Sequence, residues 1–120
     1  MELFKGYVRT CRKKSRDSFK DVELRTYDDV KNQRSFAGVL AENTVLIDVD
    51  TETESELLFK IVEAEDLRCQ VRQTNHGMHF FFKNNGAKCF NNCHTKVKSA
   101  CGFTIDVKTG KANSYSVLKN

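Results

Sequence analysis

The stretch Val45-Leu46-Ile47-Asp48-Val49-Asp50 is the most informative part of this chain, because an apolar run ends in two aspartates one residue apart. Alternate residues of a β-strand share a face, so Asp48 and Asp50 lie together, about 6.5 to 7 Å apart. Aspartate is disfavoured in strands, and two like charges on one face repel each other. A divalent cation relieves that repulsion, since carboxylate oxygens are the ligands that Mg²⁺ and Mn²⁺ prefer.

Two later stretches, His79–Lys83 and Phe103–Lys108, repeat the alternation of an apolar face and a polar face. The polar rows end in Lys83 and Lys108, which can neutralise the charge of a triphosphate on that face. The alternative is an ordinary half-solvated sheet with surface lysines.

Acidic side chains on separate strands are therefore predicted to meet. We expect Asp48, Asp50 and Asp106 to converge on one or two Mg²⁺ or Mn²⁺ ions. His79 would contact a phosphate or a metal-bound group. A lone strand histidine is often only a hydrogen-bonded structural residue, but its coincidence with the aspartates favours a site.

The rest of the chain is richer in strand patterns than in helix patterns. Further strands are predicted at Leu3–Arg9, Phe36–Ala41, Cys69–Thr74 and Asn113–Leu118. The second of these is expected to form a hairpin with the 44–50 strand around Glu42-Asn43. Residues 84–101 are predicted to form a loop, and Thr109-Gly110-Lys111 a turn.

Two helices are predicted, a short one over 27–32 and a longer one over 53–65. Thr53 and Glu56 match a capping box at the start of the longer helix, which carries one apolar stripe. Strands that outnumber helices in this order predict an α+β domain with a mainly antiparallel sheet and few helices.

Length and composition are those of one globular domain over residues 1–120. There is no proline and no linker-like tract. No apolar run is long enough to cross a bilayer, and the first residues lack the apolar stretch of a signal peptide, so no membrane partner is expected. Five cysteines, an odd number without a secretory context, favour an intracellular, cytoplasmic protein with reduced or metal-bound thiols.

Basic ends flank an acidic middle, although the net charge is only +4. The basic turn after the first strand is the densest cluster, and it suggests a polyanionic partner such as a DNA template. Its candidate phosphate-binding residues are Arg12, Lys13, Lys14 and Arg16. A solvated basic surface is the alternative.

Cysteines and a histidine crowd the predicted loop. Four side chains within thirteen residues suit a tetrahedral Zn²⁺ site, namely Cys89, Cys93, His94 and Cys101. Adjacent Cys93 and His94 are awkward joint ligands, so reduced thiols remain the alternative.

At these residues the chain resembles the archaeo-eukaryotic primase superfamily, in the primase–polymerase branch of phage and mobile-element replication proteins. Three motifs of that family occur in its order: the Asp-x-Asp strand at 45–50, small-x-His before an aromatic strand at Gly77–Lys83, and hydrophobic-Asp with a basic residue at Thr104–Gly110. The resemblance runs from about residue 36 to 118.

The resemblance implies a modified RNA-recognition-like sheet that synthesises primers or extends DNA. In that family pattern Asp48, Asp50 and Asp106 hold the catalytic ions, and His79 grips the phosphates of the incoming nucleotide. Lys83 and Lys108 would be further nucleotide-binding residues. The substrates implied are an NTP or dNTP and a single-stranded DNA template, with a helicase as partner, in the cytoplasm of a bacterial host.

The chain also departs from that pattern. It is short for a catalytic domain of this family, and the helicase part of full-length relatives is absent. We therefore expect either an amino-terminal domain of a larger replication protein or a small stand-alone form. Two other functions stay open on the same residues: a non-catalytic module that binds single-stranded nucleic acid, and a metal-dependent nuclease.

Overall fold

The computed structural model describes residues 2–84, 93–98 and 102–120. In chain order its elements are β1 (Phe4–Cys11), β2 (Lys14–Ser15), α1 (Tyr27–Val30), β3 (Phe36–Leu40), β4 (Thr44–Val49), α2 (Glu52–Ala64), β5 (Gln70–Gln73), β6 (Met78–Lys83), β7 (His94–Lys98), β8 (Thr104–Thr109), the 3₁₀ turn η2 (Gly110–Ala112) and β9 (Tyr115–Lys119). The strands form two sheets, in the orders β2-β1-β3-β9 and β5-β6-β4-β8-β7. Every pair of these strands is antiparallel, which confirms the predicted α+β class with few helices.

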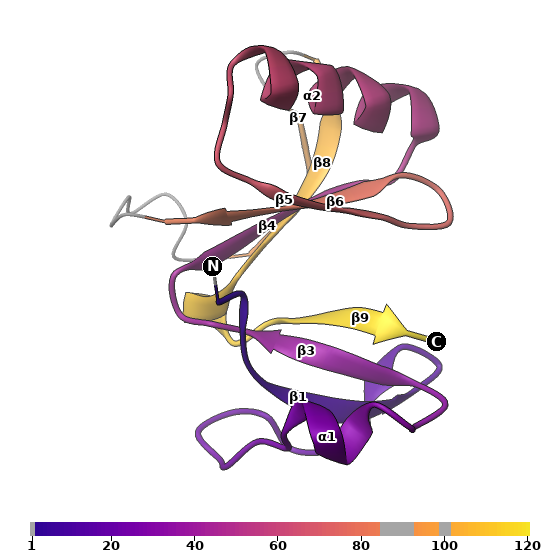
Figure 1. Cartoon of the computed structure of the whole chain (residues 1–120), viewed down its shortest axis with the longest axis vertical. Helices are drawn as coiled ribbons and strands as arrows, with labels where there is room; N and C mark the ends of the chain where they lie inside the picture. Colours follow the sequence, from indigo (N-terminus) through magenta and orange to yellow (C-terminus); the bar gives the residue numbers. More distant parts are fainter. Residues whose placement is uncertain (1, 85–92, 99–101) are drawn as a thin grey trace.

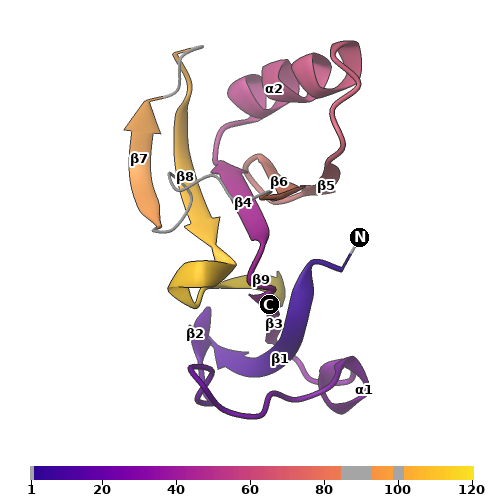
Figure 2. The same ribbon diagram turned by 90° about the vertical axis from the view of Figure 1, so that its left-hand side faces the viewer.

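The two sheets and the longer helix form successive layers (Figure 1). Helix α2 covers one face of the five-stranded sheet, and the sheet built on β1, β3 and β9 lies on the opposite side. Figure 2 gives the same order from a second direction, with α1 at the end of the molecule far from α2. The helices within the described ranges lack the length and the continuous apolar sequence that a bilayer span requires.

An apolar cluster joins the two sheets. It contains Leu3 and Leu40 from the β1–β3 side and Leu46 and Phe81 from the five-stranded sheet. The ring of Phe4 meets that of Phe81 edge-on, with centroids 5.7 Å apart. By strand alternation Leu46 and Phe81 share a face with Asp48 and His79, which the sequence predicts to be polar and outward, and at these two residues that prediction is wrong. The second sheet covers this end of the face and buries both side chains.

The predicted hairpin between the strands at 36–41 and 44–50 is also wrong, because β3 and β4 belong to different sheets. All five residues of β3 are buried, so this strand needs cover on both faces, which a two-stranded hairpin does not provide. The chain passes from one sheet to the other between β3 and β4, and it returns between β8 and β9, next to the first connection. A Cβ at Gly110 would overlap the Ala41 carbonyl oxygen, so glycine is required where the two connections touch.

Smaller differences concern the element ends. The predicted 84–101 loop contains the edge strand β7, whose polar sequence lacks the alternation that identifies half-buried strands. Helix α2 starts one residue earlier than predicted, after Thr51, and no side chain caps it. The capping box lies instead on α1, where the Thr26 hydroxyl accepts from the Asp29 N–H and the Asp29 carboxylate accepts from the Thr26 N–H.

Candidate active site

Asp48 lies at the centre of a row of polar residues that runs across the five-stranded sheet. Its Cα is paired with that of His79 on β6 and with that of Asp106 on β8. One strand further out, Arg72 on β5 is paired with His79. Residues paired in this way present their side chains to the same face of the sheet. The structure therefore brings Asp48, His79 and Asp106 together from three separate parts of the chain.

Asp50 follows the end of β4 and is exposed. Together with Asp48 and His79 it lines a cavity of about 390 Å³ at the junction of the two sheets. The opposite wall of that cavity is formed by the 117–120 segment at the end of β9.

His79 is held between the two sheets. Its Nε2 lies 3.4 Å from Asp48 Oδ1, and its Nδ1 lies 3.4 Å from the Ser116 hydroxyl on β9. Its ring also meets the edge of Phe81. The imidazole is only 14% exposed, so its orientation is fixed by these neighbours before any ligand binds.

Gly77 explains how β6 reaches this position. A Cβ there would overlap the Val49 carbonyl oxygen at the end of β4. The absence of a side chain at Gly77 lets the turn before His79 pass against the end of β4, next to Asp50.

Arg72 is a site residue that the sequence did not identify. Its guanidinium donates to the carbonyl oxygen of Val117, at 2.9 Å, and to that of Leu118. Both carbonyls belong to β9, so Arg72 ties the five-stranded sheet to the strand that walls the cavity. No local pattern indicates this role, because its partners are 45 and 46 residues away.

The two lysines predicted to bind a triphosphate have different positions. Lys108 lines the cavity. Lys83 is not among the described lining residues; its Nζ donates to the Thr44 hydroxyl at 3.0 Å, at the opposite end of β4 from Asp50. The structure thus brings Lys108, but not Lys83, to the aspartates.

Asp48 and Asp106 provide too few ligands for a cation bound by protein side chains alone. They suit better a cation whose other ligands are water and substrate phosphates. Asp106 Oδ1 accepts the Lys96 backbone N–H at 2.7 Å, and Asp48 Oδ1 faces His79. Over residues 2–84, 93–98 and 102–120, no three acidic, histidine or cysteine side chains form a metal-binding group. Mg²⁺ is commonly bound through one or two carboxylates, with water and substrate phosphates completing its shell. Asp48 and Asp106 are two opposed carboxylates, but Asp106, unlike Asp48 and Asp50, is not among the described residues that line the cavity.

The basic turn joins β1 to β2. Arg12 and Lys13 form its two-residue tip, with φ of 51° and 68°. Lys14 and Arg16 follow and are exposed. Of these four predicted phosphate-binding residues, Lys13 lines the cavity beside Asp48 and Asp50.

Two of the four predicted zinc ligands, Cys89 and Cys101, lie outside the described residues. Cys93 is exposed, and its Sγ lies 2.8 Å from the Ser114 hydroxyl, while His94 begins β7. The zinc site stays a prediction.

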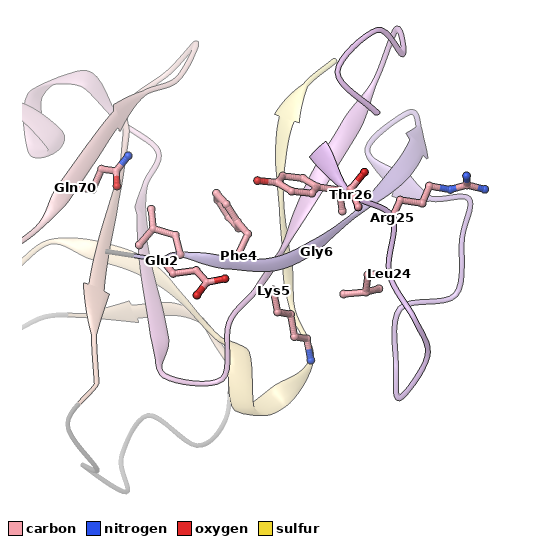
Figure 3. Close-up of a pocket in the computed structure, with 10 residues that line it drawn as sticks. Glu2, Phe4, Lys5, Gly6, Leu24, Arg25, Thr26 and Gln70 are labelled. Carbon is pink, nitrogen blue, oxygen red and sulfur yellow. The ribbon is translucent and has the colours of Figure 1, made fainter. Parts of the chain in front are cut away.

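A second depression, of about 500 Å³, lies along β1 on another side of the junction (Figure 3). In Figure 3 its labelled residues extend from Gln70 to Arg25, and the side chains of Phe4 and Lys5 point in opposite directions. Arg25 is already paired with Asp17 at 2.9 Å. Although this depression is larger, it does not gather convergent polar groups, so the smaller cavity beside Asp48 is the better candidate site.

Comparison of the chain with protein families, with curated proteins and with solved structures finds no match.

Proposed function

We propose that this chain is a metal-dependent nucleotidyltransferase domain of the primase–polymerase type, built on a modified RNA-recognition-like sheet. The observation that carries the proposal is the position of Asp48 between His79 and Asp106, at the edge of a cavity with basic walls. These residues come from the three motifs through which the sequence resembles that superfamily.

Each residue of the candidate site would have a separate role in nucleotide transfer. Asp48 and Asp106, with Asp50 nearby, would hold Mg²⁺ or Mn²⁺ together with the nucleotide phosphates. Bound there, the ions would supply charge neutralisation and would lower the pKa of the attacking 3′ hydroxyl. His79 Nε2, which faces Asp48 Oδ1, would donate a hydrogen bond to a phosphate oxygen once that carboxylate turns to the ion, while Nδ1 stays beside the Ser116 hydroxyl. Lys108 adds positive charge on the same wall, so catalysis rests on positioning and electrostatics.

The partners follow from the same proposal. The substrate is an NTP or dNTP, and the template is single-stranded DNA whose phosphates meet the basic β1–β2 turn. A helicase, joined to this domain or separate, would supply the template strand. The setting is DNA replication of a phage or mobile element in the cytoplasm of its bacterial host.

A second candidate is a non-catalytic module that binds single-stranded nucleic acid on the same fold. The exposure of all four basic side chains of the β1–β2 turn favours it, because exposed cations are free to contact phosphates. Binding by such a module would depend on the basic turn rather than on the aspartates.

Thermal unfolding in the presence of Mn²⁺ and dATP or ATP separates the two candidates. If the proposal holds, Mn²⁺ and nucleotide together raise the Tm, Asp48→Asn abolishes that rise, and the wild-type chain extends a labelled primer. Asp28→Asn is the matched control, since that carboxylate is 84% exposed and lies on α1. Stabilisation by single-stranded DNA alone, unaffected by Asp48→Asn, would establish the binding module instead. Shortening of labelled DNA without nucleotides would indicate a nuclease.

A further inference from the structure

The cavity beside the aspartates is completed by the amino-terminal part of the chain. Lys13, at the tip of the β1–β2 turn, lines the cavity together with Asp48 and Asp50. The sequence assigned Lys13 to the template with the rest of the basic turn. Its place in the structure separates it from Arg12, which precedes it in the turn and is not among the described lining residues.

The backbone of Lys13 is held in place by β9. The Tyr115 hydroxyl donates to the Lys13 carbonyl oxygen at 3.2 Å and accepts from the Ser15 N–H at 3.2 Å. The Tyr115 ring packs edge-on against Phe19, with centroids 5.1 Å apart. Since β9 continues into the wall of the cavity, the turn and that wall are connected through one side chain.

The conformation of the turn is unfavourable for the residues it contains. Two-residue hairpin loops with positive φ at both positions favour asparagine and glycine. Arg12 and Lys13 instead adopt left-handed conformations, in which the Cβ of an L-residue crowds the following carbonyl oxygen. Strain of this kind persists where the surrounding structure imposes it, and it is often found at ligand-binding sites.

The charges around the cavity indicate an anionic ligand. Among the described lining residues, four cationic residues accompany the two carboxylates of Asp48 and Asp50; they are Lys13, Arg72, Lys108 and Lys119. The Arg72 guanidinium already donates to two β9 carbonyls. A cation bound by the aspartates would neutralise their charge. The phosphates that coordinate the same cation would then lie near the lysines of the cavity.

We propose that Lys13 binds the phosphates of the nucleotide in this cavity, so that the amino-terminal hairpin is part of the nucleotide site. This inference rests on the proposed function, because the ligand is the nucleotide that accompanies the metal ion at the aspartates. It adds a nucleotide-binding residue from outside the three sequence motifs.

Lys13→Asn and Arg12→Asn form a matched pair for the test. Each removes one positive charge from the same turn, and asparagine tolerates the left-handed conformation at both positions. The probe is dATP with MnCl₂, with affinity measured by titration calorimetry on the full chain. Lys13→Asn should weaken dATP binding about tenfold, as expected for loss of one charged hydrogen bond. Arg12→Asn should change it less than about twofold, as expected for loss of an exposed charge that touches no phosphate of dATP, since no DNA template is present in this titration.

Equal losses in the two variants would overturn the inference, because they would mean a general effect of charge rather than contact. So would an unchanged affinity in Lys13→Asn. If Asp48→Asn abolishes binding while Lys13→Asn binds like the wild type, the proposed function stands and only the role of Lys13 fails. If the wild-type chain does not bind dATP with Mn²⁺, both fail.

Discussion

Asp48 on β4 and Asp106 on β8 occupy directly opposed positions in an antiparallel strand pair. Like charges placed opposite each other destabilise a sheet. Each carboxylate has one compensating neighbour, the His79 ring for Asp48 and the Lys96 backbone N–H for Asp106. The pair is therefore arranged at a cost to stability that a bound cation would remove.

Asp106→Asn should stabilise the metal-free protein by about 0.2 to 1 kcal/mol, because it ends the repulsion between opposed carboxylates. The asparagine Oδ1 can still accept the Lys96 N–H. The same change should abolish stabilisation by Mn²⁺ with dATP. Thermal unfolding in EDTA and in Mn²⁺ measures both effects, with Asp28→Asn as the control. A lower Tm for Asp106→Asn in EDTA would mean that this carboxylate has a structural role.

Arg72→Lys should destabilise the protein by about 1 to 3 kcal/mol and widen the cavity, because a lysine cannot reproduce the two donors that reach Val117 and Leu118. Urea unfolding measures the loss, and dATP affinity should fall with it. Arg68→Lys, at an exposed position in the α2–β5 connection, should have the stability of the wild type. Equal stability of both variants would show that the Arg72 contacts carry little energy.

Gly77→Ala should cost about 3 kcal/mol or more, since the added Cβ overlaps the backbone oxygen of Val49 and neither strand end can move without disturbing the polar row. Gly102→Ala is the informative comparison. Gly102 has φ +88°, and among the described residues, its own chain neighbours aside, no atom lies within 4 Å of the position that an alanine methyl group would take. Alanine there meets only backbone strain, about 1 to 2 kcal/mol. Urea midpoints of the two variants test the order, and equal losses would contradict it.

Acid should weaken the amino-terminal sheet through Asp17. Hydrogen bonds from Arg9 and then Arg25 hold the pKa of this carboxyl well below its usual value of 3.8. A depressed pKa in the folded state adds stability above pH 3.8, and that contribution declines as the pH falls below this value toward the pKa of the folded state. Wild type should therefore exceed Asp17→Asn in urea midpoint at about pH 6, and the difference should shrink at about pH 2.5. A difference that does not change with pH would contradict this.

Membership of the polar face could be predicted from the sequence, because the two-residue period of a strand follows from backbone geometry alone. That rule placed Asp48 with Asp50, and Asp106 with Lys108, on shared faces. The same rule could not show that Lys83 lies away from the aspartates. Lys83 is paired with Thr44 at the start of β4, whereas the cavity lies at the other end of that strand. The rule also could not identify Arg72, whose role depends on the position of β9.

Local periodicity and residue propensities were sufficient to predict the strands that carry the acidic and histidine side chains, the faces of those strands, and the antiparallel α+β class. Three further features required the folded chain: β4 lies between β6 and β8, a second sheet buries Leu46 and Phe81, and Lys13 lines the same cavity as Asp48 and Asp50. These features depend on contacts between residues far apart in the chain. Such contacts form because strands buried on both faces need two layers of cover, and no local pattern specifies which segments supply those layers.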